Sequence, residues 1–575
     1  MEPSIASQTS AAVETTHASD LDYVRRNVPC QWACPAFTDV PAYILAGQRA
    51  DWGLSYATNR AANLFPGVLG RICSRPCESA CRHGEPDLGE PVSICSLKRA
   101  AADRRPTDHA VTERLFAASG RTVAVVGAGP AGLAAAHDLA VFGHRVTVYE
   151  ALPRPGGMLV FGIPAFRLPR DVVEEEVFSV LRLGVQVVYG TRLGRDVRLA
   201  DLLARHDAVV VAAGCYSPRP LGVPGETLPG VIPGLSFMMD VNEGRPPAVG
   251  SRIAVIGGGF TAMDCARSAL RLGAAEVSVH LRTTEDELAV TREEVLETRR
   301  EGVRFESLRS AVEVLGGGRV EAVRFRRNRL GTAKGVARKV AVPIEGSEFT
   351  VEADTVIAAI GQAPDAREFA GGNHPPRFDR ATGACEVPRL YGAGDFVAGA
   401  STVIEAIGHA RRVATAVDAM LTGRVRRRTV VSVEPAADTH RKRSWDFLRR
   451  GDAPLLPVPE RMTPPDAEVE LGLPDEAAEA EGRRCYLCDL KYEIRVRDCI
   501  QCRWCIDVCP RDCIHLASGV GPGGKIRRTT KWNEVAAVVI DNDRCIRCGN
   551  CLRICPTRCI HVSRTRLEDR LVEVR

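Results

Sequence analysis

The sequence contains no run of about 18 consecutive apolar residues, the length that a membrane-spanning helix requires. Its first twenty residues also lack the basic start and the apolar stretch of an export signal. The 76 basic and 71 acidic side chains nearly cancel, leaving a net charge of +5 and no strong field for nucleic acid or a membrane surface. We therefore expect a cytoplasmic protein with no membrane insertion and no nucleic-acid partner.

Cysteine is abundant, with 21 residues among 575. Disulfides would suit a small secreted chain, but this chain is large and groups its cysteines in CxxC-type runs. Metal ligation in a reducing compartment fits this pattern better.

The composition changes several times along the chain and predicts several domains. We expect a disordered tail over residues 1–20, a helical cysteine-rich domain over 21–115, and alternating strands, glycine turns and helices over 120–422. Prolines and charge clusters predict a linker over 423–484, and a second cysteine-rich domain follows over 485–575.

The segment RTVAVVGAGPAGLAAAHDLAVFGHRVTVYE has the pattern of a strand, a glycine turn, a helix and a second strand. Its turn supplies the residues Gly127, Gly129, Pro130, Ala131 and Gly132. Such glycines allow a pyrophosphate to approach the backbone at a helix N-terminus. Glu150 ends the second strand, where its carboxylate can accept hydrogen bonds from ribose hydroxyls, which favours FAD.

A second unit of the same kind contains Gly257, Gly259, Phe260 and Thr261. Its second strand ends near Arg282 without a carboxylate, and a guanidinium can pair with a 2′-phosphate. This favours NADP(H); NAD(H) stays open if Arg282 is only a solvated charge. Further on, Gly394 and Asp395 stand between a strand and a helix.

The order of these motifs resembles the two-dinucleotide-domain flavoprotein reductases. The segments GGMLVFGIPAFRLPRDVVEEEV, DCARSALRLGA and AAIGQAPD closely resemble the small subunit of NADPH-dependent glutamate synthase and the corresponding part of dihydropyrimidine dehydrogenase. The resemblance implies an FAD domain over 120–245 and 360–422 with an NAD(P) domain inserted over 246–359. It also places further residues at the cofactors: Gly156, Gly157, Met158, Gly214, Gly361 and, at the FAD, Asp395.

The strongest signal is a repeat, CIQCRWCIDVCPRDCIH and CIRCGNCLRICPTRCIH, with the CxxCxxCxxxCP spacing of two-cluster ferredoxins. In these proteins the fourth cysteine of each run ligates the other 4Fe-4S cluster. One cluster is therefore expected on Cys499, Cys502, Cys505 and Cys555. The other is expected on Cys545, Cys548, Cys551 and Cys509. Zinc is the structural alternative. Cys513 and Cys559, like Cys215, Cys265 and Cys385, are interpreted as packing residues.

The N-terminal cysteine run resembles the iron–sulfur domain of glutamate synthase small subunits, but the CxxC that normally precedes Cys30 is missing. A similar element, RRCYLCD, stands far away at Cys485 and Cys488. We predict that this displaced pair completes a cluster with Cys30 and Cys81. A second cluster would use Cys34, Cys73, Cys77 and Cys95. The position that supplies the fourth ligand in this family corresponds to Lys98 here, and an ammonium cannot ligate iron. Cys95, three residues earlier, is therefore expected to be the fourth ligand. The alternative is a single N-terminal cluster.

The fold class predicted from these features is an α/β two-dinucleotide-binding-domain flavoprotein, with a Rossmann-like FAD domain and an inserted NAD(P) domain. An N-terminal α-helical iron–sulfur domain and a C-terminal α+β bacterial-ferredoxin-like domain complete it. We expect an oxidoreductase that moves electrons between NADP(H), FAD and four 4Fe-4S clusters, with no side-chain catalyst. Its expected redox partner is a protein such as ferredoxin, a 2-oxoacid:ferredoxin oxidoreductase or another reductase subunit of a larger complex.

Three rival functions remain open at this stage. The first is the small subunit of a glutamate synthase-like enzyme, whose substrate domain a separate polypeptide would supply. The second is a subunit of an electron-bifurcating transhydrogenase. The third rival is a non-catalytic scaffold that only carries clusters, which the intact dinucleotide motifs disfavour.

Overall fold

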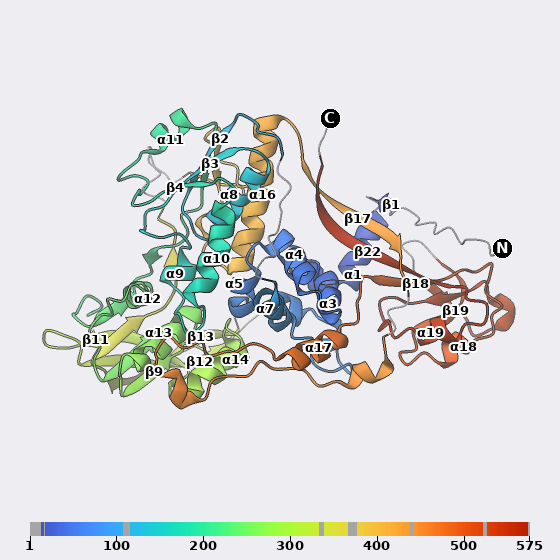
Figure 1. Cartoon of the computed structure of the whole chain (residues 1–575). Coiled ribbons are helices and arrows are strands. Elements are labelled where there is room, and N and C mark those ends of the chain that lie inside the picture. Colours follow the sequence, from blue (N-terminus) through green and yellow to red (C-terminus); the bar gives the residue numbers. More distant parts are fainter. Residues whose placement is uncertain are drawn as a thin grey trace.

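The computed structural model describes residues 13–15, 18–106, 116–332, 339–365, 376–437, 441–520 and 526–572. Figure 1 shows the dinucleotide-binding domains at one end, the cysteine-rich helices in the middle and the C-terminal module at the other end. No helix in the described part of the chain is long and apolar enough to cross a membrane.

The N-terminal domain is helical, as the sequence predicts. Short connections join its helices, and Asp39 and Asp51 cap two of them by accepting hydrogen bonds from the N–H groups of Ala42 and Leu54. The helices are α1 (Ala18–Asn27), α2 (Pro29–Ala33), α3 (Val40–Gln48), α4 (Trp52–Asn63), α5 (Pro66–Ile72), α6 (Pro76–Ser79) and α7 (Ile94–Arg104).

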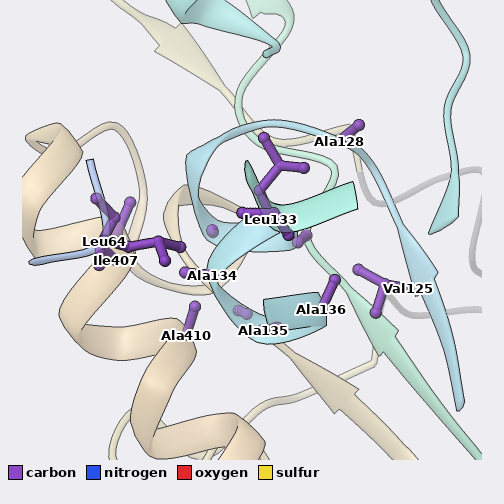
Figure 2. Close-up of a cluster of buried hydrophobic side chains, with 14 of the residues drawn as sticks. Leu64, Val125, Ala128, Leu133, Ala134, Ala135, Ala136, Ile407 and Ala410 are labelled. Atoms are coloured by element: carbon purple, nitrogen blue, oxygen red, sulfur yellow. The ribbon is translucent and has the colours of Figure 1, made fainter. Parts of the chain in front are cut away.

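The first dinucleotide-binding domain contains a parallel sheet in the order β16-β5-β2-β3-β4. Its strands are β2 (Thr122–Val126), β3 (Arg145–Tyr149), β4 (Gln186–Val188), β5 (Ala208–Val211) and β16 (Leu390–Gly392). Helix α8 (Pro130–Val141) is lined with alanines and packs closely between the sheet and α16 (Val403–Thr422). Figure 2 shows Ala134 and Ala135 of α8 beside Ile407 and Ala410 of α16. Small side chains here allow the helix to approach the strand that precedes the glycine turn.

The inserted domain has a second parallel sheet, in the order β10-β9-β8-β14-β7. Its elements are β7 (Val231–Pro233), α12 (Gly234–Asn242), β8 (Arg252–Ile256), α13 (Phe260–Arg271), β9 (Glu276–His280), α14 (Arg292–Arg300), β10 (Arg304–Glu306) and β14 (Thr355–Ala358). An antiparallel sheet of β11 (Arg309–Leu315), β12 (Ala322–Gly331) and β13 (Val340–Glu352) packs beside it.

This domain begins earlier than residue 246, where the sequence placed its start. Strand β7 pairs with β14, and Phe237 and Met238 of α12 lie in the core of the inserted domain. The two connections between the domains pair with each other as β6 (Ser217–Pro218) and β15 (Gln362–Ala363). The glycine motif marks only β8, and no local motif marks the strand before it.

The C-terminal module has the paired terminal strands of a ferredoxin-like fold, β18 (Leu490–Ile494) and β22 (Ile560–Leu571). Its other elements are α18 (Trp504–Asp507), β19 (Ile514–Val520), β20 (Ile526–Arg528), β21 (Ala537–Ile540) and α19 (Asn550–Ile554). The expected linker and tail both contribute regular structure: β17 (Arg427–Pro435) pairs with β22, and β1 (Val13–Thr15) pairs with β17. Helix α17 (Asp475–Arg484), also within the expected linker, packs on α3 and α7.

Candidate functional site

A cavity of about 530 Å³ opens at the carboxyl ends of the strands of the first dinucleotide-binding domain. The backbone of Gly127 has φ +100°, and a Cβ there would lie 2.6 Å from the carbonyl oxygen of Ala212. A Cβ on Gly132 would lie 1.9 Å from the carbonyl oxygen of Gly127, so the turn and helix can meet only through glycine.

Glu150 closes the turn, because it accepts hydrogen bonds from the N–H groups of Ala128 (2.6 Å) and Leu152 (2.7 Å). Burial raises the pKa of this carboxyl, and the backbone donors oppose that shift. Glu150 also lines the cavity, so a ligand hydroxyl can donate a hydrogen bond to the lone pairs of its carboxylate oxygens that the backbone does not use.

Many of the predicted cofactor residues meet at this cavity. Those that line it are Gly127, Gly129, Pro130, Ala131, Glu150, Gly157, Met158, Gly214, Asp395, Phe260 and Thr261. The other predicted residues do not line it: Gly132, Gly156, Gly257, Gly259, Arg282, Gly361 and Gly394. Because Phe260 and Thr261 belong to the inserted domain, the cavity spans both dinucleotide-binding domains.

Sequence reasoning missed an ion pair at the junction of these domains. Arg167 donates to Asp264 (2.7 Å), and both residues line the cavity. Ninety-seven positions separate them in the sequence, so no motif connects them. Cys215, interpreted as a packing residue, also lines the cavity and donates to the carbonyl of Asp395 (3.3 Å).

The second glycine turn repeats the geometry of the first. Gly257 has φ +141°, and a Cβ there would lie 2.1 Å from the carbonyl oxygen of Ala359. Arg282 is exposed just beyond β9, and among the described residues its guanidinium forms no ion pair. An exposed cation at this strand end can pair with a 2′-phosphate.

The displaced cysteine pair does return to the N-terminal domain. Cys30, Cys81, Cys485 and Cys488 line one small cavity together. Helix α17 is held there through Glu481, which accepts from the N–H of Ser93 (2.7 Å). Gln48 also donates to the carbonyl of Gly482 (2.6 Å).

The other N-terminal cysteines gather around Lys98. Thiols of Cys73 and Cys77 interact with that of Cys95. Burial lowers the pKa of Lys98, but the sulfurs of Cys95 and Cys73 outweigh that effect, so the pKa lies above its ordinary value. Cys34 acts on Lys98 in the same direction. A buried ammonium needs negative charge nearby, which thiolate ligands in this group would supply.

In the C-terminal module, the fourth cysteine of the first run lies with the cysteines of the second run. Cys509 lines a small cavity with Cys545, Cys548 and Cys551. The extra cysteines pack on fourth ligands: Cys513 lies 3.3 Å from Cys509 and Cys559 lies 3.5 Å from Cys555, between Sγ atoms.

Among the described residues, no three Cys, His, Asp or Glu side chains are arranged to hold a single metal ion. Two of the groups, Cys30/Cys81/Cys485/Cys488 and Cys509/Cys545/Cys548/Cys551, instead line small cavities, an arrangement that suits ligands at the separate iron corners of a cubane.

Buried contacts join the cysteine groups into a row. Ile72 and Ser74, on either side of Cys73, line the large cavity. Cysteines from both N-terminal groups share one buried cluster with Tyr43, and Cys488 and Cys548 share another with Tyr486. A third cluster unites cysteines from both C-terminal groups.

The geometry is that of an FAD-dependent oxidoreductase with iron–sulfur domains, and comparison with known proteins agrees. The chain belongs to the pyridine nucleotide-disulphide oxidoreductase family, whose model matches residues 121–422. Residues 13–110 match domain II of dihydropyrimidine dehydrogenase, a 4Fe-4S cluster domain, and residues 498–559 match a 4Fe-4S dicluster domain. The predicted fold class is therefore confirmed.

More particularly, the chain is similar to subunits of NADP-dependent oxidoreductases. It is 37% identical over 502 residues to the NADP(+)-dependent formate dehydrogenase subunit beta of Moorella thermoacetica, covering 80% of this chain and 70% of that protein. It is 35% identical to the NADPH-Fe(3+) oxidoreductase subunit beta of Geobacter sulfurreducens, covering 80% and 75%.

The NADPH-dependent glutamate synthase small chain of Azospirillum brasilense is 34% identical, covering 70% of this chain and 89% of that protein, which confirms the resemblance to this group. Among solved structures, Mycobacterium tuberculosis FprA in complex with NADPH matches 64% of this chain and 99% of its own, at 19% identity and a TM-score of 0.46.

Proposed function

We propose that this protein carries electrons between NADP(H) and a partner protein through one FAD and four 4Fe-4S clusters. The observation that carries this proposal is the row of cysteine groups, which starts at the wall of the large cavity and ends in the C-terminal module. A row of this kind suits a relay of single electrons.

FAD, bound in the large cavity, supplies the exchange between a two-electron hydride and single electrons. The protein's part is to hold the two nucleotides. Gly129 leaves room for a pyrophosphate at the start of α8, and Glu150 lines the cavity, where its carboxylate can accept from a ribose hydroxyl. Phe260 and Thr261, from the inserted domain, bring the nicotinamide nucleotide to the same cavity.

The preference for NADP(H) is assigned to Arg282. Its exposed guanidinium, without an ion-pair partner in the described structure, is available to a 2′-phosphate. The names of the similar formate dehydrogenase, iron reductase and glutamate synthase subunits all contain NADP(+) or NADPH.

Four cluster sites follow from the cysteine groups. The order along the row is the group around Lys98, then Cys30/Cys81/Cys485/Cys488, then Cys509/Cys545/Cys548/Cys551, and finally Cys499/Cys502/Cys505/Cys555. The N-terminal group nearest FAD includes Cys73, whose neighbours line the cavity.

Electrons leave the row at the last group, where the protein surface is unusually apolar. Ile500 (64% exposed), Trp504 (51%) and Ile554 (38%) adjoin its ligands. Exposed arginines surround them, including Arg503 and Arg553. A redox partner with an apolar contact patch and an acidic rim fits this surface. The relatives named as beta subunits indicate that such a partner can be another subunit.

The test is anaerobic purification followed by measurement of iron, sulfide and flavin per chain, then reduction by NADPH or NADH followed by absorbance. We expect one FAD, about sixteen irons and fast reduction by NADPH. About twelve irons would refute the displaced pair, a preference for NADH would refute the role of Arg282, and no reduction by either would favour a scaffold.

A further inference from the structure

Arg547 lies in the loop between Cys545 and Cys548, and its side chain is fully buried, with 0% exposed. Its Nε donates to the carbonyl of Leu490 (3.1 Å) and its Nη2 to the carbonyl of Cys488 (3.4 Å). Its Nη1 donates to the carbonyl of Cys545. One guanidinium therefore bridges the ligand loops of two different cluster sites.

No Asp or Glu carboxylate forms an ion pair with this guanidinium in the described part of the chain. Its side-chain partners are neutral: it donates to the amide oxygen of Asn27 at 2.9 Å and hydrogen-bonds the phenol of Tyr23. Burying a cation without an opposite charge is strongly unfavourable. The ionisable groups facing it are Tyr23, Cys488 and Cys545, so the compensating charge must come from the sulfur sites.

Other buried arginines near these cysteines differ in this respect. Arg82 and Arg441 also act on Cys488. Arg82 lies 3.6 Å from a Glu85 carboxylate oxygen, and Arg441 pairs with Asp446 at 2.6 Å. Their charges are therefore partly neutralised within the protein, whereas that of Arg547 is not.

The duplicated motif provides an internal comparison. Gln501 occupies the position of Arg547 in the first repeat, between Cys499 and Cys502. Both residues have left-handed backbones, with φ 54° for Gln501 and 55° for Arg547. The two loops thus share their local backbone geometry, and the difference between them at this position is one positive charge.

We propose that Arg547 is a positioning residue that fixes a positive charge between the cluster on Cys509/Cys545/Cys548/Cys551 and the cluster on Cys30/Cys81/Cys485/Cys488, raising the reduction potential of both. This inference rests on the proposed function. Reduction adds a negative charge to a cluster, and a permanently protonated guanidinium beside it stabilises the reduced form. Arg547 thereby sets the step at which electrons cross between the N-terminal and C-terminal domains.

The experiment is a redox titration of the full-length, iron-loaded protein with dithionite and mediators, followed by electron paramagnetic resonance. Arg547→Gln introduces the residue that the first repeat has at this position, Gln501, and Arg547→Lys keeps the positive charge. Arg544→Gln removes an exposed arginine next to Cys545 and serves as the matched control.

We expect Arg547→Gln to change the one-electron equilibrium of the two adjoining clusters at least tenfold toward the oxidised form, a potential about 59 mV lower. The outer cluster on Cys499/Cys502/Cys505/Cys555 should not shift. Arg547→Lys and Arg544→Gln should leave every potential near that of the wild type.

Unchanged potentials in iron-loaded Arg547→Gln, or an equal shift in Arg544→Gln, would overturn the inference. If Arg547→Gln does not retain iron, Arg547→Lys decides. Retention of iron and potentials in the lysine variant supports a requirement for charge, and loss of iron there makes Arg547 only a structural tie. Because dithionite replaces NADPH, these results do not depend on nucleotide or partner. Failure of the proposed function would appear separately, in the wild type, as missing iron or no reduction by NADPH.

Discussion

Replacing Cys485 and Cys488 together by serine removes two ligands from a site whose other two are Cys30 and Cys81. Helix α17 should remain docked, because Glu481 still accepts from the N–H of Ser93 and Gln48 still donates to Gly482. The variant should therefore lose one cluster, while the N-terminal domain stays folded. Iron per chain should fall from about sixteen to about twelve, with FAD retained.

The same variant should also interrupt the relay. NADPH should still bleach the flavin and reduce the cluster beside Cys73, while the two C-terminal clusters should stay oxidised because the group between them and the flavin is missing. Iron analysis and rapid-reaction absorbance measure both effects. Cys385→Ser, which changes a cysteine of the FAD domain outside the four groups, is the control. Iron that stays at about sixteen in the double variant would refute the assignment.

Three further predictions concern other parts of the molecule. Arg282→Gln should raise the KM for NADPH about tenfold, the loss of about 1.4 kcal/mol, and leave the KM for NADH unchanged; equal effects on both nucleotides would contradict its assignment. Trp504→Ser should lower kcat/KM about thirtyfold with an acidic ferredoxin as acceptor but not with ferricyanide, because only the protein acceptor needs the apolar surface. Burial raises the pKa of Glu176 to about 7, although hydrogen bonds from the N–H groups of Val68 and Gly67 oppose this shift. The carboxyl of Glu176 therefore binds its proton more tightly in the folded state than in the unfolded state. The free energy of unfolding should therefore fall by about 3 kcal/mol between about pH 4.5 and pH 7. Urea titrations should show that Glu176→Gln lacks this part of the slope, and an identical slope in the variant would contradict the reasoning.

The sequence alone determined the features that depend on local spacing. The glycine turn around Gly127 was predictable because a strand, a tight turn and a helix are consecutive in the chain, and Gly127 and Gly132 each have a steric reason to be there. The ferredoxin repeats were predictable for the same reason, since a short loop must supply three ligands to one cubane. The family followed from these local motifs.

Tertiary structure decided what depends on contacts between distant segments. The return of Cys485 to the N-terminal cysteines relies on contacts such as that of Glu481 with Ser93, 388 positions apart. The pairing of β17 with β22 turned an expected linker into part of a sheet. The sequence does not distinguish Arg547 from a surface arginine in a loop. Its proposed role follows from the burial of its guanidinium between two ligand loops, without a carboxylate as ion-pair partner. Local sequence patterns do not predict such long-range contacts, because the free energy that stabilises them comes from burial and pairing in the folded chain.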